Sequence, residues 1–295
     1  EKGTIIYLHR NAIIKIDGSL HVNGTMEEPV IFRGDRLESF YDDIPGQWGI
    51  LYLSDTSRNN MIDYAQILHG TIGILVSAPP EDENPPDLRI TNTIINHMSS
   101  FGLYALNASV YGENLVIGEC GASNVALFYK GSYEFVHCTF ANYWRSFFSN
   151  RRLPALYMAD YFIDIDSAGE EILNWNESNF EKAEFKNTII YGNEMHELVL
   201  DSYKGTKMNY LFDHCLTRID NRKFDYTQDP RFNFTINNYS PLLDSVPYSY
   251  RLDTLSPAID KGLMDYALSV PFDFNGESRV SDDGPDIGAY ERITR

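Results

Sequence analysis

A short segment with one layout recurs along this chain, and it constrains the fold more than any other feature of the sequence. Each copy has alternating apolar residues, then Asn or a small residue, then another apolar residue and a turn. The copies are MIDYAQILHG (61–70), LRITNTIINH (88–97), VYGENLVIGE (110–119), EFVHCTFANY (134–143), AEFKNTIIYG (183–192) and LFDHCLTRID (211–220). Such repetition is typical of solenoids, in which neighbouring repeats bury a shared core.

The spacing of the copies favours a parallel β-helix. When the copies are aligned, their central positions are Ala65, Asn92, Asn114, Cys138, Asn187 and Cys215. Successive positions lie 22 to 28 residues apart, except for one step of 49 residues, which is either two coils or one coil with a long loop. We therefore predict an all-β chain that folds as a single-stranded, right-handed parallel β-helix with an irregular C-terminal capping segment.

The period of two within each copy predicts which side chains point inward. Two residues after the central positions come apolar residues, with Thr217 as the exception: Ile67, Ile94, Val116, Phe140 and Ile189. We expect these residues to stack into an internal column. At the central positions we expect an asparagine ladder and packed thiols, because stacked amides can bond from coil to coil and Cys fits the same bend.

The repeats divide the chain into one long body and an irregular end. Residues 1–220 are predicted to form the coils, with loop insertions at 35–47, 78–87 and 145–180. Residues 221–295 lose the repeat and are rich in Pro and Asp, so we predict a cap that packs on the same domain and covers an open end of the solenoid.

Composition excludes several classes of partner. With 42 acidic and 24 basic residues the net charge is −18, which disfavours nucleic acid and anionic membrane surfaces. No apolar run is long enough to span a membrane. Cys120, Cys138 and Cys215 are too few and too scattered for a disulfide framework.

Two further stretches carry a family resemblance. IDGSLHVNGTMEEPVIFRGDR and IPGQWGILYL lie near the N-terminus, and LSPAIDKG (255–262), DFNGESR (273–279) and PDIGAYE (285–291) lie near the C-terminus. The chain resembles right-handed parallel β-helix repeat proteins of pectate-lyase-like architecture, in particular exported bacterial surface or lipoprotein members. The resemblance implies fold and export, and it does not imply catalysis.

Outward residues of successive coils form columns that hold the candidate catalytic residues. One place before the central positions come Tyr64, Thr91, Glu113, His137, Lys186 and His214, and three places before them come Ile62, Arg89, Tyr111, Phe135, Glu184 and Phe212. Lys186 or His137 would be a base for a proton next to a carboxylate, which Arg89 would neutralise. Glu113 and Glu184 would be an acid/base pair for hydrolysis. Alternatively, these charges merely pair across coils on an exposed strand.

Aromatic side chains offer platforms on which sugar rings can stack. The substrate-binding candidates are Tyr111, Tyr143, Trp144 and Trp175, whereas Trp48 is predicted to lie in the core. The acidic pairs Asp42/Asp43 and Asp282/Asp283 are interpreted as solvated loop charges. We therefore predict no metal site and no cofactor, with calcium as the one helper ion that the resemblance allows. Asp260 and Asp286 are expected to accept backbone hydrogen bonds in tight turns.

Three functions stay open at this point. The first is an exported surface protein that binds a glycan or polysaccharide along a groove of the β-helix. The second is a polysaccharide lyase or glycoside hydrolase acting in the same groove, and the third is a structural or adhesive stalk. We expect an extracellular or bacterial cell-surface location, a lipid anchor lost with the N-terminus, and a monomer. A catalytic site requires a basic and acidic cluster in one cleft, and a stalk requires a smooth face.

Overall fold

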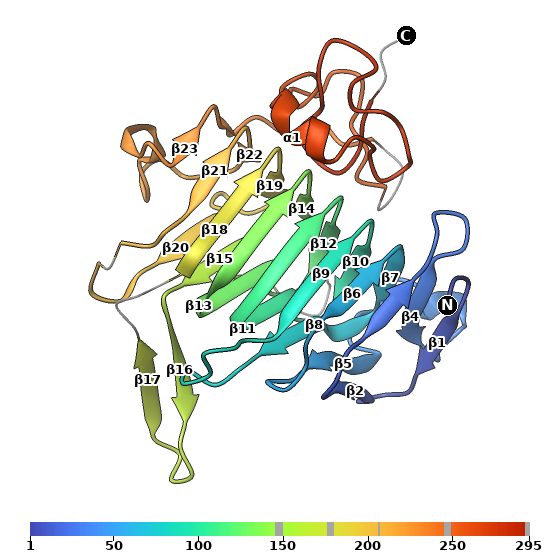
Figure 1. Ribbon diagram of the computed structural model, residues 1–295, viewed down its shortest axis with the longest axis vertical. Coiled ribbons are helices and arrows are strands. Elements are labelled where there is room, and N and C mark those ends of the chain that lie inside the picture. The colour runs from blue at the N-terminus through green and yellow to red at the C-terminus, as the bar shows by residue number, and fades with distance from the viewer. Residues whose placement is uncertain (145–149, 176–179, 206, 245–248, 293–295) are drawn as a thin grey trace.

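Stacked parallel strands dominate the computed structural model, which describes residues 1–144, 150–175, 180–205, 207–244 and 249–292. Within these ranges, two large sheets of nine and thirteen strands contain only parallel neighbours. The chain alternates between the two sheets as it winds through successive coils (Figure 1). This arrangement confirms the predicted all-β fold class, a parallel β-helix.

Each coil contributes one strand to the nine-stranded sheet. Its members, in spatial order, are β1 (Ile5–Leu8), β4 (Val30–Gly34), β7 (Ala65–Leu68), β10 (Ile94–Met98), β12 (Val116–Cys120), β14 (Thr139–Asn142), β19 (Ile189–Gly192), β22 (Leu216–Thr217) and β24 (Ile236–Asn237).

The thirteen-stranded sheet forms the rest of the wall. Its strands are β2 (Ile13–Ile16), β3 (His21–Asn23), β5 (Trp48–Leu53), β6 (Asn60–Asp63), β8 (Gly70–Ser77), β9 (Asp87–Thr91), β11 (Phe101–Glu113), β13 (Val125–Val136), β15 (Leu156–Ala159), β18 (Phe180–Lys186), β20 (Leu198–Asp201), β21 (Leu211–Asp213) and β23 (Phe232–Asn233). The long strands β11 and β13 pair with two shorter strands of a neighbouring coil, such as β8 and β9. One continuous wall therefore spans both halves of the coil.

The interior is filled by side chains that repeat from coil to coil. Phe135, Phe185, Phe212 and Phe232 stack in order, with ring centroids 5.4, 4.8 and 4.7 Å apart and planes within 19° of parallel. Trp48 is fully buried, as predicted, and its ring nitrogen donates to the Leu68 carbonyl at 2.8 Å. Because like residues lie in register, each aromatic ring covers the next.

The corner between the two sheets is made by one residue per coil in the left-handed backbone conformation. From β6 to β24 these residues are Tyr64, Asn92, Asn114, His137, Asn187, His214 and Phe234, with φ between 46° and 50°. Asn and His tolerate this conformation better than most residues do. As predicted, the three asparagines share one corner, and Asn114 Nδ2 donates to Asn92 Oδ1 at 2.9 Å.

The predicted alignment of the repeats is wrong by one residue in three of the six copies. Cys138 and Cys215 belong with Ala65, one place after the corner, where side chains point into the core. The predicted internal column therefore mixes two sides of the sheet. Ile67 and Phe140 point inward, whereas Ile94, Val116 and Ile189 pack outside the coil. The backbone conformation at the corner sets the register, and side-chain size does not.

Insertions leave the stack without breaking it. Residues between β4 and β5 include a short 3₁₀ helix, Ser39–Tyr41, and residues 78–86 connect β8 to β9. The step of 49 residues is one coil, because β14 pairs directly with β19. Its extra residues include an antiparallel hairpin of β16 (Tyr161–Ile165) and β17 (Glu171–Trp175).

The C-terminal segment packs along the side of the solenoid. Leu252, Ala258 and Ile287 contact the outer side of β19 and β22, and Tyr250, Ala289 and Tyr290 contact β12 and β14. The short helix α1 (Met264–Ser269) lies in this segment (Figure 1). These contacts run across several coils of the nine-stranded sheet, so its strands β14 and β19 are buried on both faces.

Candidate functional site

One outer face of the thirteen-stranded sheet gathers most of the predicted site residues; we call it the polar face. Strand register places Arg89, Tyr111, Glu134 and Glu184 in one row across β9, β11, β13 and β18. The next row contains Thr91, Glu113, Val136 and Lys186. Parallel pairing in register therefore brings together side chains that are up to 97 residues apart in the sequence (Arg89 and Lys186).

Arg89, Tyr111 and Glu113 form the first cluster on the polar face. Arg89 Nη2 lies 2.9 Å from Glu113 Oε2, and its guanidinium carbon lies 4.3 Å from the centroid of the Tyr111 ring. The Tyr111 hydroxyl donates to the same carboxylate oxygen at 3.0 Å. The carboxylate is thus held by two donors, and the ring carries a cation on one side.

Lys186 belongs to a second cluster, with two carboxylates. Its Nζ lies 2.8 Å from Glu134 Oε1 and 2.7 Å from Glu184 Oε2. Lys182 Nζ lies 2.6 Å from the other oxygen of Glu134. Glu134 was missed at this position, because the one-residue slip placed the buried Phe135 in the outward column. Aligning the repeats on the corner Asn and His residues identifies it.

The ionisation of the second cluster follows from these contacts. Burial lowers the pKa of Lys186, but its hydrogen bonds to Glu134 and Glu184 outweigh that effect, so the pKa is raised above its ordinary value. Burial raises the pKa of Glu134, but the two lysines lower it more, so the net pKa is lowered. Lys186 is therefore a protonated cation and Glu134 an anion near neutral pH. A general base would need the opposite shift of the Lys186 pKa.

A pocket with a volume of about 790 Å³ opens beside the polar face. Ser109 and Ser132 line it, each two residues before a residue of the first row and so on the same side of its strand. Asn107, Lys130, Arg58 and Glu181 also line the pocket.

Residues of the 78–87 loop form one wall of the pocket. Asn107 Nδ2 donates to the Pro79 carbonyl at 2.7 Å, and Lys130 Nζ donates to the Pro80 carbonyl at 3.3 Å. Arg58 pairs with Asp82 at 3.6 Å. Three coils of the solenoid thus hold this loop in place.

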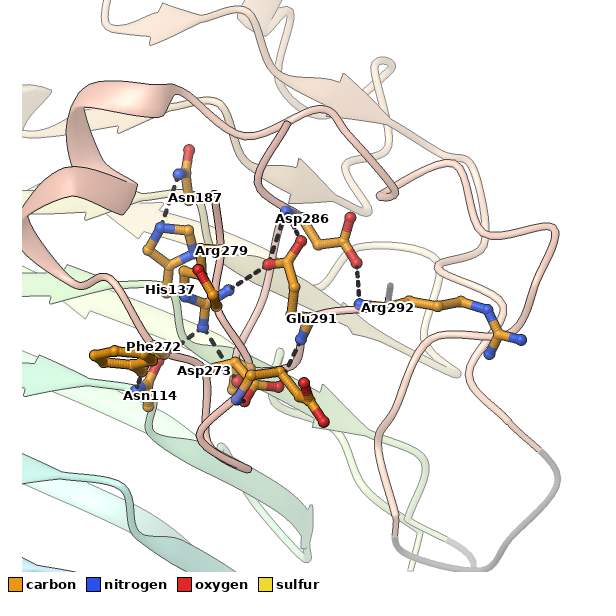
Figure 2. Close-up of polar contacts among 12 residues, drawn as sticks. Asn114, His137, Asn187, Phe272, Asp273, Arg279, Asp286, Glu291 and Arg292 are labelled. Carbon is orange, nitrogen blue, oxygen red and sulfur yellow. Dashed lines mark hydrogen bonds and ion pairs between the residues drawn. The ribbon is translucent and has the colours of Figure 1, made fainter. Parts of the chain in front are cut away.

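His137 does not lie on the polar face. The residue in register with Lys186 and Glu113 is Val136, and His137 is the corner residue that follows it. Its side chain is fully buried, and Asn187 Nδ2 lies 3.0 Å from its Nε2 (Figure 2). Burial, with a smaller contribution from the positive charge of Arg279, lowers its pKa well below the ordinary value. The predicted grouping of His137 with Lys186 is therefore wrong, because the corner turns the side chain toward the C-terminal segment.

The C-terminal segment carries a buried charged cluster beside His137. Arg279 is fully buried, its Nη1 lies 3.1 Å from Glu291 Oε2, and its Nη2 donates to Asn114 Oδ1 at 2.8 Å (Figure 2). As predicted, Asp286 accepts backbone hydrogen bonds, from Asp260 and Arg292 at 2.8 and 2.7 Å. Arg279 and Asn114 thus join the terminal motifs to the corner column, a role that spacing alone did not reveal.

The remaining aromatic candidates lie away from the polar face. Trp144 is buried, and Tyr143 is partly buried against the C-terminal segment. Trp175 lies in β17, its ring 5.4 Å from that of Tyr203. Of the aromatic substrate-binding candidates, Tyr111 lies next to the charged clusters.

The described residues show no metal-binding cluster, and the chain has no significant match among known proteins. Within the described ranges, no group of three or more His, Cys, Asp or Glu residues is arranged to hold a metal ion. Among the same residues, no helix is long and apolar enough to cross a membrane. No family model matches the chain, and neither the curated proteins nor the solved structures give a significant match.

Proposed function

We propose that this β-helix binds a polysaccharide along its polar face without cleaving it. The observation that carries the proposal is the pocket beside that face, because hydroxyl, amide and charged groups from several coils converge on it. Sugar hydroxyl groups are both donors and acceptors, so they suit a surface that presents Ser, Asn, Arg and Glu side chains together. The ring of Tyr111 adds an aromatic contact in the adjacent row.

The charge balance favours a neutral glycan. The chain carries a net charge of −18, which repels polyanions. On the polar face the cations Arg89, Lys182 and Lys186 are each within 2.9 Å of a carboxylate. An acidic sugar would have to displace these partners, whereas a neutral sugar can bond to them as they stand.

The ion pairs also argue for binding over catalysis. Lys186 keeps its proton, because the raised pKa makes it a weaker acid. His137 is buried under the C-terminal segment, away from the polar face. A lyase would need a neutral base at this place, and a hydrolase would need a protonated carboxylic acid. Location at the bacterial cell surface is part of this proposal, and it is supported by the resemblance of the terminal motifs.

Affinity electrophoresis through gels that contain neutral or acidic polysaccharides tests the proposal. We expect retardation by at least one neutral glycan, and we expect Tyr111→Ala to weaken it by about tenfold or more through loss of the ring contact. Tyr104→Ala is the matched control, because Tyr104 is also half-buried, lies on the outer side of β11 and belongs neither to the pocket lining nor to the two rows of the polar face. No retardation in any gel, or equal losses in both variants, would contradict the proposal.

A further inference from the structure

The β16–β17 hairpin, residues 161–175, is a two-stranded ribbon that extends away from the coils (Figure 1). Opposed residues of an antiparallel pair point to the same side, and Tyr161 opposes Trp175 while Ile163 opposes Leu173. One side of the ribbon, here called the apolar side, therefore carries Tyr161, Ile163, Ile165, Leu173 and Trp175. The other side carries Phe162, Asp164, Ile172 and Asn174.

The chain's own aromatic residues contact the apolar side at its base. The rings of Tyr161 and Trp175 lie 6.2 and 5.4 Å from the ring of Tyr203. Farther along the ribbon, Ile163, Leu173 and Ile165 are 53%, 41% and 65% exposed. A two-stranded ribbon is only marginally stable in water, and packing of its apolar side against a second layer stabilises it. The outer part of the apolar side is thus a surface that a partner can bury.

Charge on the ribbon identifies the chemistry of that partner. Asp166, Glu170 and Glu171 lie at the tip, and residues 161–175 contain no Lys or Arg. At the base, Lys204 Nζ lies 5.8 Å from the centroid of the Trp175 ring and 5.0 Å from that of Tyr203. The surface therefore runs from a cation through apolar side chains to an acidic tip.

The order of cation, apolar side chains and acidic tip on one ribbon complements the same order on a second ribbon that runs in the opposite direction. When two such ribbons pack face to face in opposite directions, each acidic tip lies beside the other's Lys204, and the isoleucines and leucines meet in the middle. A two-fold axis creates this arrangement, since it matches one surface with the same surface on the second copy.

We propose that a second copy of this chain covers the apolar side, so that the hairpins join two solenoids in a dimer. The three outer apolar side chains from each copy, Ile163, Ile165 and Leu173, make a small interface, which corresponds to weak association with a Kd of roughly 1–100 µM. The proposal departs from the monomer expected from the sequence. It is independent of glycan binding, because none of its residues lines the pocket or belongs to the two rows of the polar face.

Sedimentation velocity of the full chain, at concentrations from about 1 to about 200 µM to bracket that affinity, tests the proposal. We expect a monomer–dimer equilibrium. Ile163→Asp should raise the Kd by about tenfold or more, because it places an unpaired carboxylate in the apolar contact. Ile172→Asp is the matched control: Ile172 is 46% exposed, on the opposite side of the same ribbon, and its substitution should leave the Kd unchanged.

A chemical test uses the buried native thiols. Cys120, Cys138 and Cys215 are fully buried, so they are shielded from oxidation. A single cysteine introduced on the surface of the hairpin therefore reacts in preference to them. Oxidation should link Ile163→Cys into covalent dimers and leave Ile172→Cys monomeric. A wild-type chain that stays monomeric throughout the range overturns the proposal. So does a dimer that Ile163→Asp leaves intact or that both Asp variants weaken equally.

Discussion

Glu291 is a carboxylic acid that the fold buries beside other charged groups. Burial raises its pKa to about 8, and the charge of Asp286 adds to this effect while Arg279 opposes it. Burial likewise raises the pKa of Asp286, to about 6, although the backbone hydrogen bonds from Asp260 and Arg292 oppose the shift. Asp282 also contributes a negative charge near Glu291. Packing of the C-terminal segment on the solenoid therefore favours the protonated forms of Glu291 and Asp286.

The stability of the protein should consequently fall as pH rises. A folded-state pKa above the unfolded value contributes stability that is fully present below the unfolded pKa and is lost through the folded pKa. For Glu291 and Asp286 that window extends from about pH 4 to about pH 8. We expect the Tm at pH 8.5 to lie about 3 °C or more below that at pH 5.5, since 1 kcal/mol shifts Tm by about 2–4 °C at this chain length.

Glu291→Gln separates this effect from the general repulsion of a highly charged chain. The variant keeps the shape of the side chain and cannot ionise, so the difference in Tm between pH 5.5 and pH 8.5 should become smaller. Differential scanning calorimetry of both proteins measures it. An equal pH dependence in the variant and the wild type would show that Glu291 is not the titrating group.

The corner residues explain why the sequence predicts the position of some candidate site residues correctly and of others wrongly. Arg89, Tyr111, Glu113 and Lys186 were predicted on one face, and strand register brings them there. His137 was not placed correctly, because its left-handed φ of 50° makes two successive residues point outward and shifts the period of two by one. A purely alternating pattern contains no signal for such a turn.

At the scale of secondary-structure elements, the inner aromatic stack holds the later coils in register. Phe185 lies between Phe135 and Phe212, at 5.4 and 4.8 Å. Phe185→Ala should lower the free energy of unfolding by about 3–5 kcal/mol, because it leaves a cavity between two rings. Phe128→Ala, at a half-buried position on the outer side of β13, should cost only about 1–1.5 kcal/mol. Urea unfolding compares the two, and equal losses would contradict the assigned register.

The strands themselves were largely predictable, and their outer environment was not. The recurring segments identify β10, β12, β14, β19 and β22. Their consecutive apolar residues, as in Ile94–Ile95 and Ile189–Ile190, indicate burial on both faces. The prediction considered only one buried face. In these pairs the covering residue comes 134 to 150 residues later in the chain (Val116 to Tyr250, Thr139 to Ala289), a distance over which a local pattern carries no information.

At the scale of the whole molecule, different parts of the outer surface of the solenoid carry the C-terminal segment, the polar face and the hairpin. The C-terminal segment covers the outer side of the middle and later strands of the nine-stranded sheet, and the polar face with its pocket occupies part of the thirteen-stranded sheet. The hairpin leaves the coil between β15 and β18. Repetition in the sequence predicts the solenoid, because each coil packs similar side chains into the same shared core. The features of the outer surface depend on insertions and on the C-terminal segment, which do not repeat in the sequence.

Binding without cleavage is the central claim for this molecule. The direct measurement is to incubate the protein with each polysaccharide that retards it, and to follow new reducing ends together with the absorbance of unsaturated uronates. We expect no product from the wild type beyond that from Lys186→Met. Turnover by the wild type that Lys186→Met or Glu113→Gln abolishes would contradict it and would identify the polar face as a catalytic site.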